Sequence, residues 1–245
     1  MRQGFLSSMG RITLDLLYPR LCPVCQEPAP AGRLICPSCL SELPYIEYRR
    51  CQKCGKPVED GEVFCRDCTE MTHLYREGMG VFFYDDRMRE TIAALKYRHR
   101  REFGRPLGAL MYSLSRDRLL RWKPDLVIPV PVHSARRAER GYNHAAELAF
   151  PVAEFSGIPV SEAVLIRTEK TKAMKKLSAA ERRENLKGAF AVAASAEVPH
   201  RILLIDDIYT TGATVDACAG VLLAKGAEEV YFLSLAIGGG FLSQF

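Results

Sequence analysis

The chain has 245 residues, enough for one domain of medium size and a second, smaller one. Hydrophobic residues make up 48% and charged residues 26% of it, which is typical of a globular protein and excludes a disordered or fibrous chain. The net charge of +5 is too small to indicate nucleic-acid binding by itself.

The charge is unevenly distributed. Residues 76–200 contain 23 basic and 15 acidic side chains, and the basic ones gather at 96–105, 136–140 and 167–187. Such patches suit a polyphosphate, a nucleic-acid backbone or simply a solvated face. The longest apolar stretches are much shorter than the roughly 20 residues that span a bilayer, so we expect no transmembrane segment.

The first 19 residues predict a short amphipathic helix. Apolar side chains recur at helical spacing from Phe5 to Leu17, and Pro19 follows. Gly10, Arg11 and Asp15 interrupt any signal-peptide core, and no small-residue cleavage site follows. We therefore expect a cytoplasmic protein whose N-terminal helix docks on its body.

Eight of the nine cysteines form four C-x-x-C pairs within residues 20–75. Each pair can direct two thiolates at one ion, so two closed Cys₄ sites for structural Zn²⁺ are expected. The zinc would supply most of the stability of so short a segment. The predicted ligands are Cys22, Cys25, Cys36, Cys39, Cys51, Cys54, Cys65 and Cys68.

Other uses of these cysteines fit less well. A disulfide framework is disfavoured in the cytosol, redox chemistry does not need four pairs, and iron–sulfur sites usually have tighter spacing. Matched ten-residue spacers favour pairing the first pair with the second and the third with the fourth, although interleaved pairing stays open. The ninth cysteine, Cys218, is most simply a core residue.

Residues 76–245 alternate between strand-like and helix-like segments. This order predicts an α/β fold, a mostly parallel sheet flanked by helices, preceded by the small cysteine-rich module. Ligands of such folds bind where the strands end. The predicted strands are 80–84, 125–130, 163–167, 189–193, 202–205 and 229–237, and the predicted helices are 87–97, 103–114, 143–155 and 215–225.

A basic, glycine-ended loop is predicted at residues 133–143. It follows the strand 125–130, which two prolines terminate. Its arginines present forked donors that match the oxygens of a pyrophosphate, unless they are only a solvated turn. Lys96 is a second candidate wall of the same site or the exposed end of a helix. The predicted pyrophosphate ligands are Arg136, Arg137, Arg140 and Lys96.

Residues 202–214 carry the strongest signal. An aliphatic run that reads as a buried strand leads to an acidic pair, a threonine-rich turn with one glycine, and a helix. Backbone N–H groups and hydroxyls at a helix N-terminus hold phosphate, and carboxylates accept hydrogen bonds from ribose hydroxyls. An ordinary strand–helix turn would explain only one Asp and one Thr. The predicted ligand residues are Asp206, Asp207, Thr210, Thr211, Gly212, Ala213 and Thr214.

Along its full length this stretch resembles the phosphoribosyl-pyrophosphate (PRPP) motif of type I phosphoribosyltransferases. Together with the four cysteine pairs and several shorter motifs, it makes almost the whole chain similar to the ComF family. Two positions depart from the family pattern, because His144 and Met174 stand where glutamine is usual. The shorter motifs are Leu-Lys-Tyr at 95–97, Pro-Val-Pro-Val-His at 129–133, Arg-Gly-Tyr-Asn at 140–143 and Arg-Arg-Glu-Asn at 182–185.

The resemblance implies an N-terminal helix at 1–19, a double zinc ribbon at 20–75 and a type I phosphoribosyltransferase-like domain at 76–245. It implies binding of PRPP with Mg²⁺, a part in natural competence and DNA uptake, and, as partners, single-stranded DNA and the competence helicase or translocation proteins. Two alternatives stay open. One is an active phosphoribosyltransferase of nucleotide metabolism with an unknown acceptor, in which Asp206 and Asp207 would be catalytic; the other is an inactive module that binds PRPP and single-stranded DNA.

Overall fold

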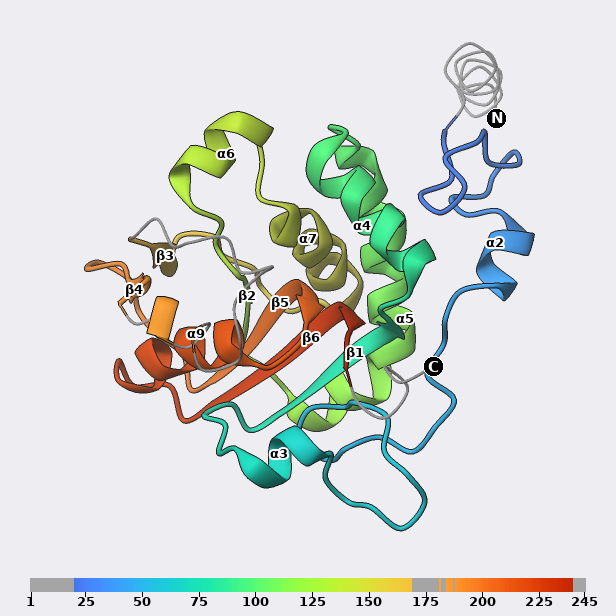
Figure 1. Cartoon of the computed structure of the whole chain (residues 1–245). Helices are drawn as coiled ribbons and strands as arrows, with labels where there is room; N and C mark the ends of the chain where they lie inside the picture. Colours follow the sequence, from blue (N-terminus) through green and yellow to red (C-terminus); the bar gives the residue numbers. More distant parts are fainter. Residues whose placement is uncertain (1–19, 169–180, 182–183, 187, 240–245) are drawn as a thin grey trace, which may run out of the picture. The chain divides into compact units, whose positions relative to one another are not determined.

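The computed structural model describes residues 20–168, 181, 184–186 and 188–239 (Figure 1). The chain forms two compact units, Met1–Leu43 and Pro44–Phe245. The predicted helix at 1–19 and Met174 lie outside the described residues. The domain boundaries predicted at residues 19 and 75 remain predictions.

A four-stranded parallel sheet is the centre of the second unit (Figure 1). Its strands are β1 (Glu77–Phe83), β2 (Leu126–Pro129), β5 (Arg201–Tyr209) and β6 (Glu229–Ile237), in the order β1-β6-β5-β2. Residues 202–205 of β5 and almost all of β6 are apolar and buried, as expected for inner strands covered on both faces. The predicted fold class, a parallel sheet flanked by helices, is confirmed.

Strand β5 extends further than its aliphatic run predicts. It stays paired with β6 up to Tyr209, opposite Ile237, whereas its pairing with β2 ends at Ile205, opposite Pro129. Proline in β2 stops the ladder on that side. Asp206 and Asp207 therefore lie within the strand, and their side chains point to opposite faces of the sheet.

Helices cover both faces of this sheet (Figure 1). Helices α5 (Gly104–Trp122) and α7 (His144–Ser156) pack on one face, with α4 (Asp86–Tyr97) on the same side. The other face holds α9 (Ala213–Leu223) and, beside it, an antiparallel pair, β3 (Leu165–Arg167) and β4 (Phe190–Val192). None of the helices in the described part of the chain is long and apolar enough to span a membrane.

Two helical segments differ from the predictions. Helix α5 is longer than 103–114, because Leu119 and Trp122 are also buried. The segment predicted as a loop at 133–143 contains a short helix, α6 (Ser134–Arg140). The His133 ring caps it by accepting a hydrogen bond from the Ala135 N–H, and Gly141, at a φ of 81°, ends it.

The two cysteine segments share one local fold, repeated at an offset of 29 residues. A bridge joins Leu21 to Pro28 in the first ribbon and Arg50 to Pro57 in the second. Each ribbon ends in a short helix, α2 (Pro37–Ser41) or α3 (Arg66–Glu70). The first ribbon lies in the first compact unit, and the second lies in the unit that contains the sheet.

Candidate functional site

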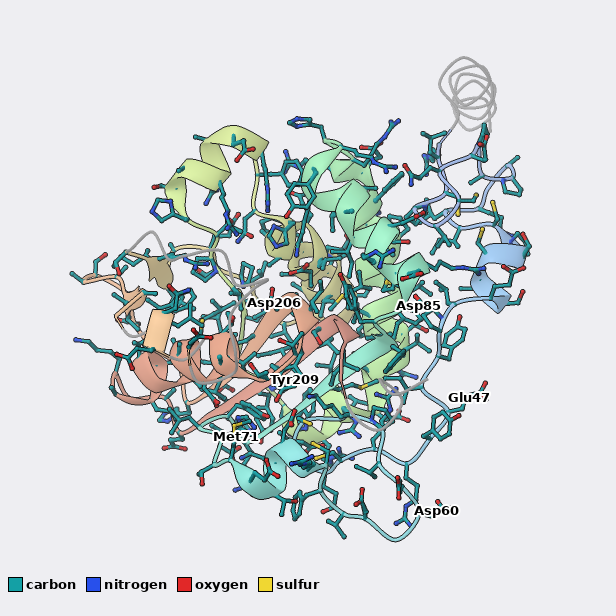
Figure 2. All side chains as sticks on the ribbon, viewed as in Figure 1. Glu47, Asp60, Met71, Asp85, Asp206 and Tyr209 are labelled. Carbon is teal, nitrogen blue, oxygen red and sulfur yellow. The ribbon has the colours of Figure 1, made fainter. Side chains whose placement is uncertain are left out.

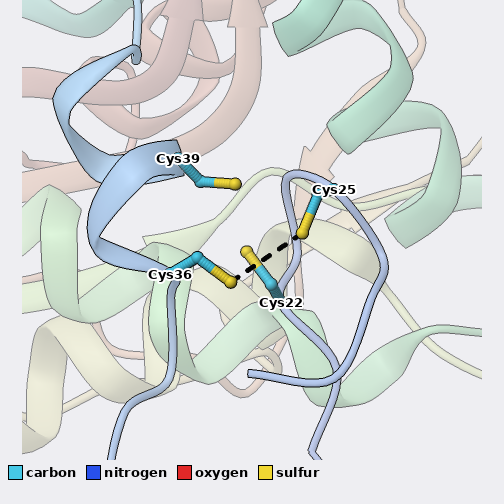
Figure 3. Close-up of side chains that lie close together, drawn as sticks. All are labelled: Cys22, Cys25, Cys36 and Cys39. Carbon is cyan, nitrogen blue, oxygen red and sulfur yellow. Dashed lines mark hydrogen bonds between the residues drawn. The ribbon is translucent and has the colours of Figure 1, made fainter. Parts of the chain in front are cut away.

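The eight paired cysteines form two clusters, each made of two successive C-x-x-C pairs. The first cluster is Cys22, Cys25, Cys36 and Cys39 (Figure 3), and the second is Cys51, Cys54, Cys65 and Cys68. The preferred pairing, first pair with second and third pair with fourth, is therefore confirmed. In each cluster the four sulfur atoms all lie within 4.8 Å of one another.

The donor set fits zinc. The Cys25 and Cys36 sulfurs lie 3.9 Å apart, and those of Cys54 and Cys65 lie 3.5 Å apart. A tetrahedral Zn²⁺ with Zn–S bonds of about 2.3 Å separates its sulfurs by ~3.8 Å. The cysteines in the described residues form no disulfide. Four sulfurs in each cluster would fill all four positions of a tetrahedral zinc, as in a closed structural site.

The surroundings lower the pKa of Cys22 in the first cluster and of Cys51 and Cys65 in the second. Burial opposes ionisation of Cys22, but hydrogen bonds from backbone N–H groups, including that of Cys36, lower its pKa to about 7. Hydrogen bonds from the three partner thiols lower the pKa of Cys51. Since thiolate is the form that binds metal, both clusters contain a cysteine prepared for coordination.

The threonine-rich turn and the start of α9 form the second part of the site. Gly212 caps the helix with a φ of 80°, in the left-handed region that glycine adopts without strain. The first N–H groups of α9 have no partner within the helix, and the helix dipole makes this end favourable for an anion. The turn lines a small pocket whose walls are Asp206, Ile208, Tyr209, Thr210, Thr211, Gly212, Ala213, Thr214 and Val215.

The acidic pair, of which Figure 2 labels Asp206, is divided between two environments. Asp206 faces the pocket of the threonine turn, and its Oδ1 accepts the backbone N–H of Asp207 at 2.8 Å. Asp207 faces the side of the sheet that α4, α5 and α7 cover. There its carboxylate pairs with Lys96 from α4 and lies 3.3 Å from His144 Nε2 of α7. Only Asp206 is therefore open to a ligand in the pocket.

The same division separates their acidities. Burial and the neighbouring Asp207 charge raise the pKa of Asp206 well above its usual range. Burial acts in the same direction on Asp207, but Lys96 and His144 hold its pKa well below the usual range. Asp207 is thus the permanent carboxylate of the pair.

His144 connects this carboxylate to Arg140. Arg140 Nη1 lies 3.3 Å from His144 Nδ1, which accepts the hydrogen bond, so the ring proton belongs on Nε2, facing Asp207. Burial lowers the pKa of His144, which keeps the ring neutral. Arg140 is buried and stacks 4.6 Å from the centre of the Tyr97 ring. Lys96, Asp207, His144 and Arg140 form one continuous polar chain.

These polar side chains do not form a site for a resident magnesium ion. Oxygen and nitrogen atoms of His144, Asp206 and Asp207 do lie within 4.8 Å of one another. However, the Lys96 ammonium already neutralises Asp207, and Mg²⁺ prefers oxygen ligands in an octahedral arrangement. A magnesium ion at this site would need further oxygens from a ligand.

The remaining predicted arginines have different surroundings. Arg136 and Arg137 are exposed on α6, and Arg137 pairs with Glu162 at 3.2 Å. Arg167 on β3 is largely buried, and burial together with the charge of Arg136 lowers its pKa. Arg136 therefore has a basic neighbour, Arg167, the first residue of the basic patch at 167–187.

Two histidines, His73 and His144, adjoin the site although neither was predicted as a ligand residue. His73 follows the second ribbon, and its Nδ1 lies 2.7 Å from Oδ2 of Asp216 in the first turn of α9. A single histidine 143 residues from its partner carries no sequence signal. His144, in contrast, stood out in the sequence as a departure from a motif, although its contact with Asp207 did not.

The structure shows an α/β domain and two Cys₄ ribbons, and the ribbons also match a known family model. Residues 13–69 match the model of the double zinc ribbon domain. The chain is 30% identical over 207 residues to competence protein F of Haemophilus influenzae, covering 82% of this chain and 90% of that one. It is 32% identical over 202 residues to competence protein ComFC of Bacillus subtilis, covering 78% and 79%.

The chain belongs to the ComF family. It is also 30% identical over 228 residues to the DNA utilization protein YhgH of Escherichia coli O157:H7, covering 90% of this chain and 91% of that one. Among solved structures, a purine phosphoribosyltransferase of Pyrococcus horikoshii aligns with a TM-score of 0.33 and 18% identity, over 52% of this chain and 70% of that one.

Proposed function

We propose that this ComF-family protein binds PRPP in the pocket of the threonine turn and acts in competence-type DNA uptake. One observation carries the binding: the turn at 210–214, the N-terminus of α9 and the free face of Asp206 line a single pocket. The N–H groups and hydroxyls of the turn would take the 5′-phosphate. Asp206 would accept hydrogen bonds from the ribose hydroxyls.

The pyrophosphate half of the ligand would extend toward the basic side chains of α4 and α6. Arg136, Arg137, Arg140 and Lys96 are the candidates, and the buried Arg140 has an Nε atom that makes no hydrogen bond within the described residues. Mg²⁺ would enter with PRPP, held mainly by phosphate oxygens. Asp207, already paired with Lys96 and His144, would act on the ribose only by orienting its surroundings.

The part in DNA uptake rests on the family. Its members include proteins named for competence and for DNA utilization. Incoming DNA is single-stranded in our proposal, and basic groups with neighbouring aromatic rings, such as Arg140 over Tyr97, are the chemistry that binds single strands. The competence helicase or translocation proteins would be its protein partners.

An active phosphoribosyltransferase is the second candidate. It is favoured by two cations close to the acidic pair, Lys96 and the buried Arg140, because departing pyrophosphate needs positive charge. In that case PRPP and an acceptor would release pyrophosphate. Asp206→Asn would abolish the release.

A thermal-shift series tests PRPP binding. Full-length protein with Mg²⁺ would be scanned with PRPP, ribose 5-phosphate, pyrophosphate, nucleotides, bases and a short single-stranded oligonucleotide. A ligand present at about 100 times its Kd adds roughly 2.7 kcal/mol of stability, so PRPP should give the largest rise in Tm. An absent shift at saturating PRPP would refute the binding proposal.

One variant separates the candidates. Asp206→Asn should remove the PRPP shift while leaving oligonucleotide binding and its steep salt dependence intact. Loss of both would mean that one surface takes both ligands. Pyrophosphate release above the Asp206→Asn background, with any base as acceptor, would favour the enzyme.

A further inference from the structure

The second ribbon is joined to the edge of the sheet by backbone contacts. The Gly78 N–H of β1 donates to the Lys53 carbonyl at 2.8 Å, and the Phe83 N–H donates to the Pro44 carbonyl at 2.8 Å. Arg50 Nη1 donates to the Gly80 carbonyl at 2.7 Å. The ribbon therefore holds β1 at several points along its length.

Gly55, which directly follows the third cysteine pair, lies against the backbone of β1. A Cβ atom built there would lie 2.9 Å from both the Gly78 carbonyl oxygen and Met79 Cα, and both are backbone atoms that a rotamer change cannot move. Three cysteines of the second ribbon, Cys51, Cys54 and Cys65, belong to the hydrophobic core of this unit. Metal binding at this cluster thus fixes part of the core.

The segment that follows Cys68 continues to the pocket. His73 Nδ1 bonds Asp216 Oδ2 at 2.7 Å, and the Leu74 N–H bonds Asp216 Oδ1 at 2.9 Å. Both contacts are to the first turn of α9, the helix whose N-terminus forms the proposed phosphate site. These two hydrogen bonds fix the orientation of the first turn of α9.

Tyr75 adds a second connection. Its hydroxyl lies 2.7 Å from the hydroxyl of Tyr209, the last residue of β5 before the threonine turn. The Tyr75 ring stacks on His73, at 4.9 Å between ring centres, and packs edge-on against Phe232 of β6. His73 and Tyr75 form one rigid pair behind the pocket.

Gly212 shows how close this support lies to the turn. A Cβ atom at Gly212 would be 2.8 Å from the Tyr209 hydroxyl oxygen and 2.9 Å from His73 Cε1. The turn that would bind the phosphate therefore rests directly on the histidine ring. Since the His73 side chain is fully buried, it supports the turn and does not touch a ligand in the pocket.

We propose that the second zinc ribbon braces the phosphate turn through His73, so that metal in the second cluster, and not in the first, sets the affinity for the phosphosugar. For the identity of the ligand, this inference rests on the proposed function. His73 is a positioning residue in this account. Its N–H holds Asp216, and Asp216 holds the first turn of α9.

The sequence offers a matched pair of variants. Cys39→Ser and Cys68→Ser each remove the fourth cysteine of one cluster, and each should reduce the zinc content from two ions to one. His73→Ala removes the brace with both ions retained, and His73→Asn restores an N–H donor near the position of Nδ1. Zinc content and far-UV circular dichroism of the full-length chain would verify each variant before use.

Two readouts decide the proposal. Amide hydrogen exchange at residues 209–216, without any ligand, should accelerate at least about tenfold in His73→Ala and Cys68→Ser. The Kd for PRPP should rise at least about tenfold in the same two variants. Cys39→Ser and His73→Asn should stay within about twofold of the parent chain in both measurements.

Several results would overturn the brace. One is unchanged exchange and unchanged affinity in His73→Ala containing two zinc ions. Another is an equal effect of Cys39→Ser and Cys68→Ser, or failure of His73→Asn to restore the parent behaviour. If Cys68→Ser does not fold, the histidine pair decides alone. If the parent chain does not bind PRPP, the proposed function fails, while hydrogen exchange still tests the brace.

Discussion

The two zinc ribbons share one cysteine spacing and one set of turns, yet they occupy different environments. In the first ribbon Cys25 is exposed, and the ribbon lies in a compact unit of its own. In the second ribbon the equivalent Cys54 has no exposed surface, and the ribbon is part of the sheet domain. Cysteine spacing therefore determines the metal cluster but not the surroundings of the ribbon.

The two ribbons differ at the residue that follows the second cysteine of each. Both ribbons have a left-handed residue after the second cysteine, Gln26 at a φ of 63° and Gly55 at a φ of 77°. The first ribbon tolerates a side chain there. The second cannot, because β1 backbone occupies the space of a Cβ. Glycine therefore stands at this position in the ribbon that lies against β1.

Exchanging these two residues should give the largest effect. Gly55→Gln adds left-handed strain and a clash with the β1 backbone, and we expect a loss of about 3 kcal/mol or more in the free energy of unfolding. The control, Gln26→Gly, removes strain but adds flexibility to the unfolded chain, so it should change stability by less than about 1 kcal/mol. Thermal and urea unfolding of the zinc-loaded chain would measure both. Equal effects of the two substitutions would contradict the comparison.

A smaller effect is expected from the hydroxyl pair behind the pocket. Tyr75→Phe leaves the buried Tyr209 hydroxyl without its partner, which should cost about 1–3 kcal/mol. The double variant Tyr75→Phe/Tyr209→Phe removes both groups, and it should cost less than the sum of the two single changes. Urea unfolding of all four chains would form the cycle. Strict additivity would mean that the two hydroxyls do not interact.

Chelation should distinguish the clusters by rate. The first cluster has one buried and one exposed cysteine, whereas the second has three buried cysteines and no exposed one, so we expect metal to leave the second cluster only after local opening. We expect two phases of zinc release to a chromophoric chelator, the faster by about tenfold, an opening free energy of roughly 1.4 kcal/mol. Cys39→Ser should lack the fast phase. A single phase in the parent chain would contradict the different burial of the two sites.

Much of the architecture could be predicted from the sequence because it depends on local patterns. Continuous aliphatic runs predicted the inner strands, and the bounds of 229–237 agree with β6. The cysteine spacing predicted both clusters. Asp206 and the threonine turn do line one pocket, whereas Asp207 faces the other side of the sheet, and what the pocket binds remains a prediction.

The features that were missed depend on long-range contacts. Strand β5 extends through the acidic pair only because β6 continues beside it, and this extension separates Asp206 from Asp207. The contacts between His144 and Asp207 and between His73 and Asp216 join residues that are 63 and 143 positions apart. Helix α6 was missed because its arginines were interpreted as a phosphate loop, although His133 and Gly141 are suitable helix-capping residues.

The central claim is that the threonine turn and Asp206 bind PRPP. Isothermal titration of the zinc-loaded, full-length chain with PRPP and Mg²⁺ tests it most directly. We predict one site per chain, with a Kd that rises at least about tenfold in Asp206→Asn. An absence of binding heat across several temperatures, or equal affinity of the parent chain and Asp206→Asn, would contradict the account.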